Sequence, residues 1–438
     1  MDFPPSINST PQELSLSANV HWIHGIWYPV RHFSPGLRST LPGCEHPDSA
    51  SPGSTLSLVT APSLITRCSE SLPEESLARL RTATTITPLF CAILTLLFPV
   101  HSRAEASIEK VRIAEGIYQF ITSPDGYVPN GNSVVIINED DVLVFDTFTR
   151  PSTARKVLAE IRKLTPKPVR YIVNSHWHPD HWSGNEVYAR EFPGLEIIAT
   201  EETRQIMLNV ANAWPALYDA GLKKDEADFG REISTGRQAD GTVLTPEQRA
   251  KDEALMQRGR EYIAEALQVH RTYPTLTYTD KFTLYHGGRE FRFLSMVGDA
   301  AGTTVMYLPK EKILSTGDLL SYPVPYYTPP LSRHAHSLQT LAQFDVDVII
   351  PGHGPAWHDK DYLNLELLLL ESIVKQVTQA VQKGLVTVED VQKEVNVEDL
   401  RSRFTHDDPD LDKKYRRFVK GMIENAYREA RDGKKFEY

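Results

Sequence analysis

The period of the hydrophobic positions changes along the chain and divides it into four regions. The first 80 residues are rich in Ser and Pro and keep no sustained helical or strand period, so a disordered or non-native extension is expected there. A short apolar run dominates 81–106, and from residue 107 to 360 strand-like segments alternate with turns and helices. From 361 to 438 apolar residues recur at helical spacing. The pattern therefore predicts one α/β domain followed by a helical region.

Within the α/β domain, the pattern predicts individual elements. We expect strands at 116–121, 133–137, 142–145, 169–174 and 196–199, and a helix at 151–164. A polar, helix-prone insertion at 201–270 interrupts the strands, which resume at 283–285, 290–294, 305–308, 312–315 and 346–350. Further helices are expected at 337–344, 363–382, 388–394 and 411–431. The insertion suits either a lid or a solvated appendage, and the C-terminal helices either close one face of the domain or form a homodimer contact.

The segment 81–106 has the order of a secretory signal. Basic residues precede an apolar run at 86–100, and Ser102-Arg103-Ala104 or Ala104-Glu105-Ala106 supplies a small-x-small cleavage site. The run is shorter than the about 20 residues of a membrane span. We therefore expect a periplasmic or secreted protein whose native start lies near this segment, without a stable membrane span after cleavage. A buried helix or an uncleaved anchor is the alternative.

Charge and cysteine content narrow the function classes. The formal net charge is −10 at pH 7 and there is no long Lys or Arg run, which argues against a nucleic-acid partner. All three cysteines, Cys44, Cys68 and Cys91, precede the α/β domain. A site in that domain therefore needs neither disulfides nor thiolate ligands.

A dense group of metal-binding side chains follows the strand predicted at 169–174: His176, His178, Asp180 and His181. Side chains two apart in an extended segment share a face, so His176 and His178 can hold one ion together. Asp180 and His181 lie beyond Pro179, where the chain turns, and can address a second ion. An HxHxDH match by chance is on the order of one in a thousand for this composition, so the cluster predicts a metal site.

Two other predicted strands end in metal-binding residues. The strand at 312–315 runs into Gly317-Asp318, and the strand at 346–350 runs into Pro351-Gly352-His353-Gly354. Each pair alone is a weak signal, because such turns are common. Strands of one layered α/β domain deliver their ends to a shared edge, so we expect Asp318 and His353 to join the histidine cluster.

From Ile108 to Asp359 these motifs resemble the metallo-β-lactamase-fold hydrolase superfamily. The segment His176 to His181 matches its HxHxDH signature, and Val144-Phe145-Asp146-Thr147 resembles its early strand-plus-Asp motif. Gly317-Asp318 resembles the bridging aspartate, and Pro351-Gly352-His353-Gly354 resembles the last histidine motif. The resemblance implies a four-layer αββα sandwich, here with a helical insertion and C-terminal helices, and a two-metal site that usually holds zinc.

The resemblance also assigns roles to individual residues. It implies the following ligands: His176 and His178 for the first metal, Asp180, His181 and His353 for the second, and Asp318 for both. A metal-bound hydroxide would attack the scissile bond, with Asp180 as our candidate catalytic residue. Asp146 would orient the ligand loop without binding metal.

One position departs from the family pattern. Asp299 stands where the superfamily normally places another histidine of the first metal site, in Val297-Gly298-Asp299-Ala300-Ala301. Three interpretations remain open: a carboxylate ligand, as in the secreted alkylsulfatase branch, a weak first site with one firmly held ion, or a degenerate non-catalytic relative. A carboxylate ligand makes the site less positive and brings Mn or Fe into consideration beside zinc.

Fold and metals do not name the substrate, because the superfamily acts on many compounds. We expect a hydrolase of an ester, lactone, thioester or related small molecule. A β-lactamase is an alternative, although no Lys follows Asp318 closely to bind the drug carboxylate. An iron-dependent oxidoreductase and a non-catalytic metal-binding relative are further alternatives. His334 and His336 are expected just before the helix at 337–344, as capping or pocket-wall residues.

Overall fold

The computed structural model describes residues 20–23, 26–29, 107–123, 127–209, 213–239, 241–326 and 330–433. The cysteines and the segment predicted as an export signal lie outside these residues. Within the N-terminal extension, β1 (Val20–Ile23) and β2 (Ile26–Pro29) pair as an antiparallel hairpin. None of the described helices combines the length and apolar composition needed to cross a membrane.

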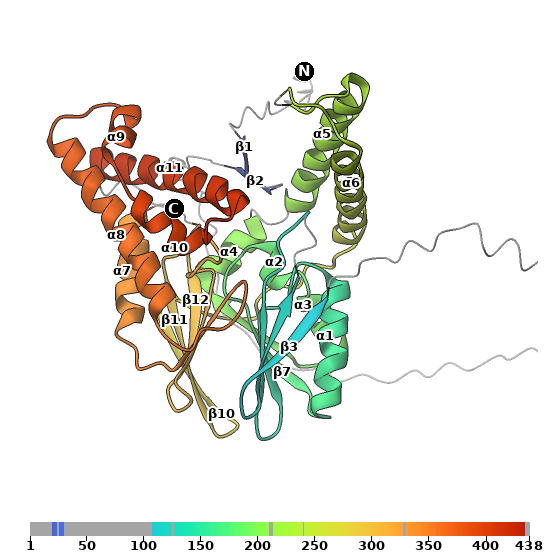
Figure 1. Cartoon of the computed structure of the whole chain (residues 1–438). Coiled ribbons are helices and arrows are strands. Elements are labelled where there is room, and N and C mark those ends of the chain that lie inside the picture. The colour runs from blue at the N-terminus through green and yellow to red at the C-terminus, as the bar shows by residue number, and fades with distance from the viewer. Residues whose placement is uncertain are drawn as a thin grey trace, which may run out of the picture. The chain divides into compact units, whose positions relative to one another are not determined.

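The first large sheet, to which β3 and β7 in Figure 1 belong, has seven strands in sequential order. They are β3 (Ile108–Ala114), β4 (Ile117–Thr122), β5 (Ser133–Ile137), β6 (Val142–Phe145), β7 (Val169–Val173), β8 (Glu196–Thr200) and β9 (Leu276–Tyr278). Pairing is antiparallel from β3 to β6 and parallel from β6 to β9. Because β6, β7 and β8 run parallel, their C-terminal ends meet at one edge.

The second sheet contains β10 (Lys281–His286), β11 (Arg289–Met296), β12 (Thr303–Leu308), β13 (Ile313–Gly317) and β14 (Val348–Pro351). Only β13 and β14 are parallel, so they too end at a common edge. The two sheets face each other across an apolar core that includes Phe145 and Val173 from the first and Phe291, Met306 and Ile350 from the second.

Helices cover the outer face of each sheet. On the first sheet, α1 (Pro151–Leu164) and α3 (Asn185–Glu191) bury a stripe that includes Val157 and Ile161 of α1 and Tyr188 of α3. This spacing places the apolar side chains of α1 on one side of the helix. On the second sheet, α7 (Leu331–Ala342) and α8 (Asp361–Gln382) pack against residues of β12 to β14. The predicted αββα sandwich is confirmed.

The two additions to the sandwich are helical, as the sequence predicts. The insertion forms α4 (Glu201–Asn209), α5 (Trp214–Thr235) and α6 (Pro246–Ala266). At the C-terminus, α9 (Val388–Glu394), the 3-10 helix η2 (Glu398–Leu400), α10 (Arg401–Thr405) and α11 (Pro409–Asp432) follow α8, and side chains of α9 to α11 join the core on the outer side of the second sheet. These helices therefore close one face of the domain; homodimer formation through them stays a prediction.

Most predicted elements lie where the pattern places them. The hairpin strands at 133–137 and 142–145 and the helices at 151–164 and 388–394 have the predicted bounds. The helix predicted at 337–344 begins earlier, at Leu331. His334 and His336 therefore lie inside α7, and the interpretation of these residues as helix caps is wrong.

Candidate metal centre

The histidine cluster lies in the loop that leaves β7 and enters the short helix α2 (Pro179–Trp182). His178 is the extended residue before α2, and Pro179 occupies the first helical position, which its fixed φ angle favours. The turn of α2 then carries Asp180 and His181. All four predicted residues of the cluster are buried.

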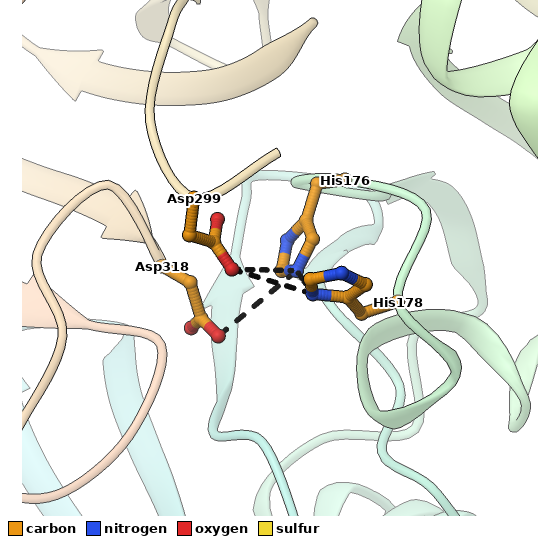
Figure 2. Close-up of side chains that lie close together, drawn as sticks. All are labelled: His176, His178, Asp299 and Asp318. Carbon is orange, nitrogen blue, oxygen red and sulfur yellow. Dashed lines mark hydrogen bonds and ion pairs between the residues drawn. The ribbon is translucent and has the colours of Figure 1, made fainter. Parts of the chain in front are cut away.

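The first group of side chains contains His176, His178, Asp299 and Asp318, which converge from separate segments (Figure 2). His176 Nε2 and His178 Nδ1 lie 2.8 Å apart. Asp299 Oδ2 is 3.3 Å from His178 Nδ1 and 3.8 Å from His176 Nε2. Asp318 Oδ2 completes the group at 4.0 Å from His176 Nε2.

The second group contains Asp180, His181, His353 and again Asp318. His353 Nε2 lies 3.2 Å from an oxygen of Asp180 and 3.2 Å from Asp318 Oδ2. His181 Nε2 lies 3.3 Å from Asp180 Oδ2 and 3.4 Å from Asp318 Oδ2. All seven residues predicted as ligands are thus brought together, in two sets that share Asp318.

The spacing of these atoms fits metal ions. Ligand atoms 2.0–2.2 Å from a tetrahedral ion lie about 3.4 Å from one another, which matches most of these separations. One of the buried atoms, Asp318 Oδ1, has no hydrogen-bond partner among the described residues. Buried polar atoms in folded proteins nearly always have a partner, and a bound cation would supply one.

The charges of the site also favour cations. Although burial opposes it, the carboxylates of Asp318 and Asp180 raise the pKa of His353 to about 10 and that of His181 well above its usual range. Burial lowers the pKa of His176, which is therefore neutral, as a metal-binding imidazole must be. Burial raises the pKa of Asp299 to about 6. Divalent ions bound here would displace the protons of His181 and His353.

Asp146 holds the ligand loop from behind. It follows β6 with a φ of 62° and is 1% exposed. Its Oδ1 accepts a hydrogen bond from the backbone N–H of Ser175 at 2.7 Å, and its Oδ2 accepts one from Ser175 Oγ at 2.7 Å. The same Oδ2 lies 2.8 Å from His181 Nδ1. This contact directs Nε2, the other ring nitrogen of His181, at the second group.

Two glycines allow the strand ends of the second sheet to approach the site. Gly317 has a φ of 52°, and a Cβ there would lie 2.6 Å from Ser175 Cβ. A Cβ on Gly352 would collide with Asp318 Oδ1 and lie 2.8 Å from the carbonyl carbon of Gly317. The Gly-Asp and Gly-His turns of the sequence are therefore required by close packing around Asp318.

The insertion supplies a residue that sequence reasoning missed. Trp214, at the start of α5, is 3% exposed, and its ring lies 6.4 Å from the ring of His178 and 5.9 Å from that of Trp177. It belongs to an apolar cluster that joins α5 and α6 to Trp182 of α2. The distance of Trp214 from the histidines along the sequence does not indicate that they are in contact, because only the folded insertion brings Trp214 to the metal loop. The insertion is thus packed onto the metal loop.

Comparisons with known proteins agree with this geometry. The model of the metallo-beta-lactamase superfamily matches residues 126–353, more than half of the 438 residues and all seven candidate ligands. The chain belongs to the metallo-β-lactamase superfamily. Its place there, together with the His/Asp groups, supports a metal-dependent hydrolase.

Three known proteins illustrate what this chain is similar to. A linear primary-alkylsulfatase from Pseudomonas sp. (strain ATCC 19151) is 25% identical over 270 residues, covering 58% of this chain and 48% of that protein. The structure of the stereoselective inverting sec-alkylsulfatase Pisa1 from Pseudomonas sp. has a TM-score of 0.50 at 18% identity, covering 74% of this chain and 50% of that one. A metallo-beta-lactamase from Pontibacter korlensis has a TM-score of 0.43 at 19% identity, covering 60% and 99%. This superfamily member spans about half the length of both alkylsulfatases.

Proposed function

We propose that this superfamily member is a metal-dependent hydrolase that splits aliphatic sulfate esters with water at a two-metal site. The observation that carries the proposal is the pair of His/Asp groups that share Asp318. The substrate class is supported by the similarity to a linear primary-alkylsulfatase. Asp299 in place of a histidine is consistent with it, because acidic ligands are a feature of the alkylsulfatase branch.

We assign the metal ligands by group. His176, His178 and Asp299 would hold one ion, and Asp180, His181 and His353 the other, with Asp318 between them. Divalent ions in these places would acidify a water molecule and withdraw charge from the sulfate oxygens. Zinc is our first choice, with Mn or Fe as alternatives because three of the seven ligands are carboxylates.

The exposure of the two groups suggests where the ester enters. In the first group, the side chains of His176 and Asp299 are almost inaccessible to solvent, with exposed fractions of 0% and 2%. The His353 side chain is 24% exposed and that of Asp318 is 13% exposed. An ester would therefore approach from the His353 side. Asp180, whose pKa the neighbouring His181 and His353 lower against the effect of burial, is anionic, as a metal-binding carboxylate must be.

The test is metal analysis combined with a substrate panel. The purified chain is stripped with a chelator, reloaded with zinc and assayed for sulfate release from a linear primary alkyl sulfate, beside a carboxylic ester, a lactone, a thioester and a β-lactam. We expect two ions per chain and sulfate release that is lost on stripping and in Asp318→Asn. Turnover of the lactam without sulfate release would make the protein a β-lactamase. Oxygen consumption with bound iron would favour the oxidoreductase alternative.

We also propose that the protein is exported. The proposal depends on the signal-like order of residues 81–106. N-terminal sequencing of the native protein should find a start after Ala104 or Ala106, and an intact Met1 would contradict export by this signal.

A further inference from the structure

The turn that carries Asp318 is bonded to the helices on the outer side of the second sheet. His334 of α7 lies with Nε2 2.8 Å from the carbonyl oxygen of Leu319. A carbonyl can only accept, so this nitrogen carries the proton. The hydroxyl of Tyr362 in α8 donates to the carbonyl of Ser321 at 2.7 Å and to that of Pro323 at 3.1 Å. Helices α7 and α8 thus hold the backbone directly after Asp318.

Tyr362 also contacts the segment that follows His353. Its ring stacks on that of Trp357 with centroids 4.6 Å apart and an angle of 17°. The backbone of Trp357 is paired with Ile349 of β14, at 2.8 and 2.9 Å. One side chain of α8 therefore contacts the two segments that follow β13 and β14 and carry Asp318 and His353. Helix α8 begins after residue 353, where the match to the superfamily ends.

We propose that Tyr362 is a positioning residue for Asp318, so that helix α8 sets how tightly both metal ions are held. This inference rests on the proposed two-metal site. Metal–ligand distances tolerate only about 0.2 Å, and Asp318 belongs to both groups, so a small shift of its backbone weakens two sites at once. Residues that orient a ligand typically change metal affinity 10- to 100-fold.

The first test compares two matched hydroxyl deletions in the full chain. Tyr362→Phe removes the bonds to Ser321 and Pro323. Tyr415→Phe removes a similar buried bond, from the Tyr415 hydroxyl to the carbonyl of Val397 at 2.8 Å, within the same helical layer but on a segment that carries no ligand. Zinc affinity is measured by chelator competition, the visible spectrum with cobalt reports ligand geometry, and thermal melting of the stripped chain reports stability.

We expect both variants to lose stability, but only Tyr362→Phe to weaken zinc binding, by about tenfold or more, and to alter the cobalt spectrum. Equal zinc affinities and identical cobalt spectra in the two variants would overturn the proposal.

The readouts separate this inference from the proposed function. Zinc affinity and the cobalt spectrum need no substrate. If the wild-type chain binds two ions and Tyr362→Phe weakens zinc binding, but the wild-type chain releases no sulfate, only the substrate assignment is refuted. A wild-type chain that binds no divalent ion would refute both.

Discussion

Asp146 offers a quantitative test of how the ligand loop is held. The substitution Asp146→Asn keeps the size of the side chain but replaces one acceptor oxygen with an N–H₂ group, which cannot accept from Ser175 Oγ or His181 Nδ1 at their distances of 2.7 and 2.8 Å. The imidazole of His181 then loses the contact that directs Nε2 toward the second group. We expect the affinity of that group for zinc to fall 10- to 100-fold. This corresponds to about 1.4–2.8 kcal/mol.

The assay is zinc competition against a chelator of known affinity, with Asp141→Asn as the control. Asp141 is also buried, lies 2.5 Å from His286 Nε2 and accepts from Asn138 Nδ2 at 3.1 Å. It precedes β6, whereas Asp146 follows it, so the two carboxylates lie at opposite ends of one strand. The control should lower the melting temperature and leave zinc affinity unchanged. Equal affinity in the two variants would refute the orienting role of Asp146.

Four further predictions concern the same centre. Asp299→His should leave the fold intact and shift metal preference from manganese toward zinc; two tightly held ions in Asp299→Ala, found by metal analysis, would show that Asp299 is no ligand. Zinc loading at pH 7 should release protons, measured by calorimetry in two buffers, because His353 and His181 are protonated in the metal-free chain. The pKa of His353 is raised from 6.5 to about 10, so the stabilising contribution of its protonated form is complete below pH 6.5 and is lost as the pH rises toward 10. This loss should lower the melting temperature of the metal-free chain as the pH rises through this range. Trp214→Ala should lower the free energy of unfolding in urea by about 3–5 kcal/mol. It should also weaken metal binding by the group that contains His178 more than by the other group. Equal weakening of the two groups would argue against contact between the insertion and the His178 group.

Local elements and the residue types of the site follow from the sequence alone. Helix α1 and the hairpin of β5 and β6 have the predicted bounds because their apolar positions follow one period without interruption. The HxHxDH cluster was visible because its four residues are adjacent in sequence. Asp318 and His353 could be added because each follows a strand, and strand ends of one domain meet.

How these residues are grouped, and which residues hold them in place, depends on the packing of the whole domain. That Asp318 lies between two sets of ligands depends on the register of β13 and β14, which local periodicity does not specify. Trp214 and Tyr362 come from helical segments whose apolar pattern shows that one face of the helix is buried, but not which residues it packs against. Contacts between residues far apart in sequence form only when the layers pack. The sequence pattern therefore predicts the candidate ligands, whereas the residues that hold these ligands in place are identified only in the folded structure.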